Sequence, residues 1–213
     1  MTESKASAPH FYLSTEIEMD ALLAAAERAN VGRAREDRIT VTPFLLRAVA
    51  LTLAEHPAFN AVWNGEVVER LDALNISVAI ALDDGLIAPA LLDCRDRGIA
   101  DLAAGLRDLV TRTRAGKLRA PEIAEGTFTL SNLGMFDVTS FIAIITPPQV
   151  AILATARTVE RAVVRDGEIV VRKIMTTTLS SDHRVVDGVG AAGFLGTLKR
   201  LIEEPTDWVG SSP

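Results

Sequence analysis

The chain has 213 residues, of which 48% are hydrophobic and 23% charged, and this balance is typical of a globular domain with one sizeable core. Its 22 basic and 28 acidic residues give a formal net charge of -6, and the basic residues are scattered instead of forming a stripe with aromatics, so we expect no nucleic-acid partner. The apolar runs fall short of the roughly 18 residues that a membrane span needs, and no targeting signal is visible. We therefore expect no membrane partner and a cytoplasmic location.

The N-terminal part of the chain predicts a strand followed by a helix. Apolar and polar side chains alternate from Phe11 to Met19, which is the period of a half-buried strand. Asp20 is placed to cap an alanine-rich helix that stops near Gly32. The charged stretch 33–38 should then form a solvated loop.

A buried helix, a hairpin and a third helix are predicted next. Thr42 and Pro43 supply a cap and a first-turn proline for a helix over 42–56, whose circumference is apolar enough for burial. In the segment 75–92, two apolar runs flank an Asp-Asp-Gly turn, which is a strong hairpin signal. The third helix should span about 99–114.

The last part of the chain is rich in predicted strands and ends in a helix over about 186–204. Helices and strands are mixed without a strict alternation. The predicted fold class is therefore α/β, with a mixed β-sheet and helices packed on one face, in a single domain covering residues 1–213. The predicted strands here are 126–131, 141–145, 150–156, 160–173 with a turn at Asp166-Gly167, and 174–181.

A strand-to-helix junction holds a candidate catalytic histidine. In "SSDHRVVDGVG", His183 lies between Asp182 and Arg184, and Asp187 falls near the first turn of the following helix, where the helix dipole favours a carboxylate. An imidazole titrates near pH ~6.5, so His183 could act as a general base toward a thiol. Taken alone, the segment favours a structural histidine in a capping sequence. A metal site is not expected, because one cysteine and three separated histidines form no local ligand cluster.

Two further side chains could take part in chemistry. In "GTFTLSNLGMFD", the strand pattern ends at Ser131 and Gly134 allows a sharp turn, so a hydroxyl that could donate to an oxyanion is presented at the mouth of a sheet. Ser131 does not stand in a Gly-x-Ser-x-Gly motif, so it is not expected to be a nucleophile, and a plain turn residue is the alternative. Cys94 is the single cysteine of the sequence, so an internal disulfide is excluded. Its setting is more typical of a small apolar side chain that fills the core than of a reactive thiol.

Five stretches of the sequence, taken in order, resemble one known family. They are "PHFYLSTEIEMDALL", "LDDGLIAPALLDC", "GTFTLSNLGMF", "ITPPQVAIL" and "LSSDHRVVDGVGAAGFL". Together they resemble the catalytic (core) domain of the dihydrolipoamide acyltransferases, the E2 component of the 2-oxoacid dehydrogenase complexes. This resemblance covers nearly the whole chain. It implies a chloramphenicol-acetyltransferase-like two-layer sandwich that forms a homotrimer with active sites at subunit boundaries.

The resemblance also implies an activity and residue roles. An acyl group, acetyl by the likeness of "SNLGMF" and "LSSDHRVVDG", would move between a dihydrolipoyl thiol and coenzyme A without a metal. His183 would be the general base that takes the proton of the attacking thiol. Ser131 would hydrogen-bond the oxyanion of the tetrahedral intermediate, and Asp187 would orient His183 or its surroundings.

The implied partners are the dehydrogenase (E1) and dihydrolipoamide dehydrogenase (E3) components and a lipoyl domain, around a trimer or a larger cubic or icosahedral core. The upstream lipoyl and partner-binding domains of full-length members are expected to be absent from this chain. Two positions depart from the family pattern: Thr146 stands where Asn usually precedes Pro-Pro-Gln, and Asp137 stands where glycine is frequent. Two alternatives stay open, a stand-alone acetyl-coenzyme A-dependent acetyltransferase acting on a small hydroxyl or amine compound, and a non-catalytic core scaffold.

Overall fold

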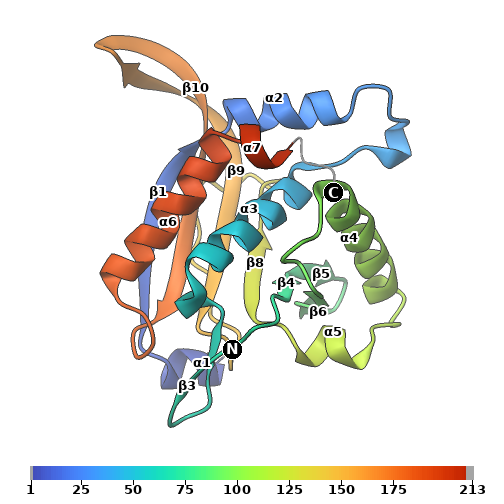
Figure 1. The fold of residues 1–213 in the computed structure, drawn as a ribbon, viewed down its shortest axis with the longest axis vertical. Helices are drawn as coiled ribbons and strands as arrows, with labels where there is room; N and C mark the ends of the chain where they lie inside the picture. Colours follow the sequence, from blue (N-terminus) through green and yellow to red (C-terminus); the bar gives the residue numbers. More distant parts are fainter. Residues whose placement is uncertain (1, 210–213) are drawn as a thin grey trace.

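A computed structural model describes residues 2–209, which form a six-stranded mixed sheet with helices packed on one of its faces (Figure 1). The strand order is β1-β10-β9-β8-β4-β7. The three long strands β1, β10 and β9 pair antiparallel, whereas β9, β8 and β4 pair parallel and β7 closes the edge antiparallel to β4. The strands of this sheet are β1 (His10–Glu18), β4 (Ile76–Val78), β7 (Ala90–Leu91), β8 (Phe128–Asn132), β9 (Ala151–Arg165) and β10 (Glu168–Asp182).

Four long helices form the second layer, and the remaining helices and strands are short. The long helices are α2 (Asp20–Ala29), α3 (Val41–Glu55), α4 (Ile99–Arg114) and α6 (Gly188–Glu203). Two short ribbons, β2 with β3 and β5 with β6, stand outside the main sheet. The remaining elements are α1 (Thr2–Ser7), η1 (Arg35–Asp37), η2 (Pro57–Phe59), β2 (Ala61–Trp63), β3 (Val68–Arg70), β5 (Ile80–Leu82), β6 (Gly85–Ile87), α5 (Ala120–Ala124) and α7 (Thr206–Val209).

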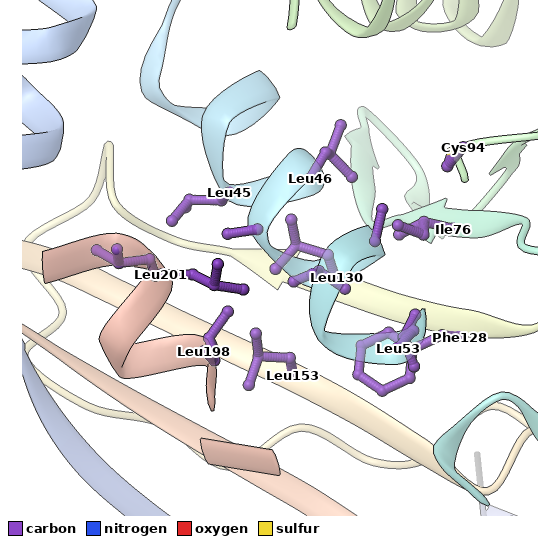
Figure 2. Close-up of a cluster of buried hydrophobic side chains, with 14 of the residues drawn as sticks. Leu45, Leu46, Leu53, Ile76, Cys94, Phe128, Leu130, Leu153, Leu198 and Leu201 are labelled. Atoms are coloured by element: carbon purple, nitrogen blue, oxygen red, sulfur yellow. The ribbon is translucent and has the colours of Figure 1, made fainter. Parts of the chain in front are cut away.

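The hydrophobic core fills the space between the helices and the sheet (Figure 2). Leu130 of β8 and Leu153 of β9 are partners across the two strands, and both point to the helix-covered face. They lie with Leu45 of α3 and Leu198 of α6, and all four side chains are almost fully buried. Burial of each such leucine stabilises the fold by roughly 2 kcal/mol. Because side chains alternate along a strand, the residues next to these leucines point to the helix-free face.

Most elements agree with the sequence prediction. The mixed sheet with helices on one face is confirmed, and α4 has the predicted bounds. The hairpin in 75–92 is confirmed, although it splits into a β4–β7 pair within the sheet and a β5–β6 ribbon outside it. The predicted strands 150–156 and 160–173 prove to be parts of one long β9–β10 hairpin, which turns where Asp166 and Gly167 both have positive φ, at 52° and 84°.

Two predicted helix caps are wrong. The backbone of Met19 caps α2, and the carboxylate of Asp20 instead accepts a hydrogen bond from the Lys173 backbone at 3.0 Å, which ties the helix start to β10. Helix α3 begins one residue before Thr42, whose hydroxyl accepts from the Asn132 side chain at 3.1 Å. In both cases the polar side chain was expected to cap the helix from its local sequence. It instead hydrogen-bonds a residue that is distant in the sequence.

The predicted strand 141–145 is also wrong, since this segment is irregular. It crosses the helix-free side of the sheet, and side chains of the sheet and of α1 take its backbone polar groups. Pro147 and Pro148 follow after Thr146 and lack N–H donors, which disfavours extension into a ladder. Short apolar runs of this kind do not distinguish a strand from a buried loop.

Candidate active site

Ser131 lies near the end of β8 and faces the helix-free side of the sheet. Its neighbour Leu130 points into the core, so the alternation of the strand turns the serine hydroxyl away from the helices. The side chain lines a cavity of about 530 Å³ together with Thr129 and Ile152. Within residues 2–209 the Ser131 hydroxyl has no hydrogen-bond partner, so it is free to bind a group that enters the cavity.

The turn after Ser131 is held by the next side chain. Asn132 Oδ1 accepts from the Gly134 backbone N–H at 2.8 Å, and its Nδ2 donates to Thr42 Oγ1. The Leu133 backbone N–H donates to the Thr155 carbonyl at 2.9 Å. The pairing of Asn132 with Thr42 joins residues 90 positions apart, and no sequence signal marks it. These bonds fix the direction in which β8 presents Ser131.

The walls of this cavity are mainly apolar, and part of its rim is exposed. Met135, Phe136 and Ile142 line the cavity with 69%, 54% and 58% of their surface accessible. Large apolar side chains gathered in this way at a polar hydroxyl mark a binding or interaction surface. An apolar wall lowers the local dielectric, which strengthens a hydrogen bond from Ser131 to a developing negative charge.

One of the two departures from the family pattern lines this cavity, and the other follows a lining residue in the sequence. Thr146 is one of its lining residues. Asp137 follows the exposed Phe136 and forms an ion pair with Arg157 at 2.5 Å, so its charge is compensated by a cation on β9. The additional carboxylate beside the Ser131 turn is therefore paired with a positive charge.

His183 follows the last residue of β10 and is exposed. Its ring packs on Phe11 of β1 with the centroids 4.6 Å apart, and its backbone N–H donates to the Pro9 carbonyl at 3.0 Å. The backbone and one face of the ring are thus held, while the side chain stays accessible.

The residues on either side of His183 brace each other. The Asp182 carboxylate is buried and accepts hydrogen bonds from the Arg184 guanidinium, the shortest at 2.6 Å, and from the Arg184 backbone at 3.0 Å. These hydrogen bonds raise the pKa of the Arg184 guanidinium. The same guanidinium stacks 4.8 Å from the Trp63 ring centre. These contacts hold the turn that carries His183 in one conformation, and no sequence pattern marks the contact with Trp63.

Asp187 is the N-cap of α6. Its Oδ1 accepts from the Gly190 backbone N–H at 2.8 Å. Within the described part of the chain, no hydrogen bond joins Asp187 to His183. In this single chain the carboxylate therefore acts on the helix that follows the histidine.

A single chain does not bring Ser131 and His183 together. Ser131 pairs with Ala154, which pairs with Thr178, and His183 lies five residues beyond Thr178, just past the end of β10. Two strand spacings across and five residues along correspond to roughly 15–20 Å. The two side chains also belong to opposite faces, since His183 packs on Phe11 of the core side. A site that uses both residues needs a second copy of the chain.

Cys94 is a buried filler, as predicted. Its thiol is inaccessible and donates to the Leu91 carbonyl at 3.0 Å. Burial raises the pKa of the Cys94 thiol to about 11, which suppresses the reactive thiolate. Among residues 2–209, no group of three or more His, Cys, Asp or Glu could hold a metal ion. In the same range, no helix is long and apolar enough to cross a bilayer.

Comparison with known proteins places this geometry among acyltransferases. The family model described as "2-oxoacid dehydrogenases acyltransferase (catalytic domain)" matches residues 1–209. The dihydrolipoyllysine-residue acetyltransferase component of the pyruvate dehydrogenase complex of Rickettsia bellii is 41% identical over 207 residues, which are 96% of this chain and 50% of that protein. The chain thus spans about half the length of this curated relative.

Solved structures with the same architecture include two acyltransferase cores. One is a dihydrolipoamide acetyltransferase from Azotobacter vinelandii, studied for the catalytic role of a serine, a histidine and an asparagine, with 29% identity, a TM-score of 0.90 and coverage of 96% of this chain and 85% of that one. The other is the cubic core of a pyruvate dehydrogenase multienzyme complex, with 30% identity, a TM-score of 0.88 and the same coverages. Chloramphenicol acetyltransferase, at 17% identity and a TM-score of 0.64 over 92% of this chain and 89% of its own, shares the fold. The predicted chloramphenicol-acetyltransferase-like sandwich is confirmed.

Proposed function

The chain belongs to the family of 2-oxoacid dehydrogenase acyltransferase catalytic domains, and we propose that it moves an acetyl group between the thiol of a dihydrolipoyl group and the thiol of coenzyme A. The family membership and the acetyltransferase named for the Rickettsia bellii relative support both the reaction and the acyl group. The observation that carries the proposal is the unpartnered hydroxyl of Ser131, set in an apolar cavity in a sheet that also carries His183, just after the end of β10.

The spacing of the three candidate residues supports their roles. In the Azotobacter vinelandii protein, the serine and the histidine are 52 residues apart, and the asparagine lies four residues beyond the histidine. Ser131, His183 and Asp187 have the same two spacings. Asp187 therefore stands where that protein has an asparagine, and an oxygen acceptor is kept at this position.

The proposed reaction needs one base and one oxyanion donor. His183 takes the proton of the attacking thiol, whose ordinary pKa of about 8.5 leaves it mostly protonated at neutral pH. The sulfur then bonds to the thioester carbonyl carbon, and the negative oxygen accepts a hydrogen bond from the Ser131 hydroxyl. When the carbonyl re-forms, the other C–S bond breaks, and the leaving sulfur takes the proton from the His183 imidazolium. Atoms and charge balance without a metal or redox step.

We also propose the assembly and the partners. Since Ser131 and His183 lie far apart on one chain, the active site would form between subunits of a homotrimer, and the cubic core among similar structures supports a larger assembly. The E1 and E3 components of the complex and a lipoyl domain on a separate segment would be its partners. A cytoplasmic location suits a reaction between free thiols.

Acetyl transfer from acetyl-coenzyme A to free dihydrolipoamide tests the proposal. The wild-type chain should catalyse the transfer, and His183→Ala should reduce it by at least about 10²-fold, as loss of a general base does. His56→Ala is the matched control, because His56 binds Thr197 in the helix layer. If the folded wild type acetylates only hydroxyl or amine compounds, the proposed function is wrong and the chain acts as a stand-alone acetyltransferase. Transfer to no acceptor would favour the scaffold.

A further inference from the structure

The irregular segment 141–146 forms one wall of the cavity that contains Ser131. Five of its six residues line this cavity. The segment crosses the helix-free side of the sheet and is not part of any sheet. We name it the wall segment. Its position sets how much room a substrate finds beside the Ser131 hydroxyl.

Three side chains from other elements hold the backbone of the wall segment. The Ile145 backbone N–H donates to His10 Nε2 at 3.2 Å, and the Ile145 carbonyl accepts from Ser4 Oγ of α1 at 2.6 Å. The Ala143 carbonyl accepts from Ser180 Oγ of β10 at 2.7 Å. Both backbone groups of Ile145, whose side chain is 1% exposed, are therefore held by side chains.

We call these three side chains the tethers of the wall segment. Among them, His10 has the most specific hydrogen-bonding requirement, because its two ring nitrogens have different partners. Its Nδ1 lies 2.8 Å from the Ala8 carbonyl and must donate, while Nε2 must accept from the Ile145 backbone. These two bonds fit the ring tautomer with its proton on Nδ1. Without an acceptor here, the buried N–H of Ile145 would lose its partner.

We propose that His10 is a positioning residue for substrate binding, acting through Ile145 on the wall of the Ser131 cavity. This inference rests on the proposed acyl transfer for its role in turnover, but the tether itself does not. His10 touches no reacting atom. Its loss should therefore weaken substrate binding and leave the chemical step largely intact.

The test compares His10→Leu with His10→Gln, because the Gln amide oxygen can replace Nε2 as the acceptor and Leu offers none. His56→Leu is the control for loss of a half-buried histidine with one hydrogen bond, to Thr197, outside the cavity. Amide hydrogen exchange of the wall segment should be about 3- to 10-fold faster in His10→Leu, as loss of one hydrogen bond allows, and near wild type in the other two. Equal exchange in all three variants would overturn the tether.

The second readout separates positioning from general stability. In His10→Leu the KM for dihydrolipoamide should rise by about 3- to 10-fold with kcat within about twofold, and His10→Gln should restore it. A fall in kcat with unchanged KM would show a structural role only. If the wild type shows no transfer, the proposed function fails by itself. The dissociation constant of dihydrolipoamide in the same variants then decides the role of His10, and equal values would overturn it.

Discussion

The proposed acyl transfer depends most directly on the hydroxyl of Ser131. It is half-buried and faces an apolar cavity, where a single donor to an oxyanion acts in a low dielectric. We expect Ser131→Ala to lower kcat by roughly 10²-fold with little change in KM, because the bond forms only as charge develops. Steady-state kinetics on both thiol substrates measure this. An unchanged kcat would remove Ser131 from the mechanism.

Asp187 combines a structural role with a catalytic one that is still a prediction. Because its carboxylate caps α6 through Gly190, Asp187→Ala should lower the free energy of unfolding by about 1 kcal/mol, whereas Asp187→Asn should change it by only a few tenths. Urea denaturation at fixed protein concentration tests this. Asparagine keeps an oxygen acceptor, so Asp187→Asn should also keep most of the turnover. A loss of turnover with full stability would show that the negative charge itself acts on His183.

A buried ion pair fixes α5 to α4. Arg112 binds the Glu122 carboxylate through two nitrogens at 2.5 and 2.6 Å, and Glu122 also accepts from the Arg119 backbone at 2.8 Å. The hydrogen bonds from Arg112 lower the pKa of Glu122. A carboxylate whose pKa is lowered by folding stabilises the fold above its unfolded pKa of about 4.3 and loses this contribution as the pH falls through its folded pKa.

We therefore expect Glu122→Gln to destabilise the fold by about 1–2 kcal/mol at pH 7 and by progressively less below pH ~4. As the pH falls through the folded pKa of Glu122, the wild-type side chain is protonated and comes to resemble the amide. Urea midpoints measured from pH 7 to pH 3 follow this difference. Asp108→Asn, which removes the exposed partner of the same Arg112, is the control and should have a small effect at every pH. A difference for Glu122→Gln that did not change with pH would contradict the role of this ion pair.

Sequence patterns predicted those elements whose local and tertiary preferences agree. Helix α4 has one apolar stripe and the β9–β10 hairpin turns on Asp166-Gly167, so periodicity and turn chemistry were sufficient. They failed where a polar side chain hydrogen-bonds a residue distant in the sequence, as the Asp20 carboxylate does with the Lys173 backbone N–H. They also failed for 141–145, where apolar residues line a cavity instead of joining a ladder. Such contacts join residues far apart in sequence, and no local window contains them.

The sequence indicated the candidate residues of the active site but not their arrangement in space. Ser131 and His183 were singled out from a turn and a strand end. Only the register of β8, β9 and β10 shows that one chain keeps them roughly 15–20 Å apart. The exposed apolar side chains around the Ser131 cavity agree with a face that a second copy covers.

This separation predicts complementation between two inactive variants. A trimer that contains both Ser131→Ala and His183→Ala chains has boundaries where an intact serine from one chain meets an intact histidine from the next. Every mixed trimer, whichever variant is in excess, has one intact boundary out of three, so about a third of wild-type activity should return in the purified mixed trimers. Co-expression with two different affinity tags and tandem purification would isolate such mixed assemblies. Mixed assemblies that stay at the rate of either variant alone would show that both residues must belong to one chain, in conflict with the strand register.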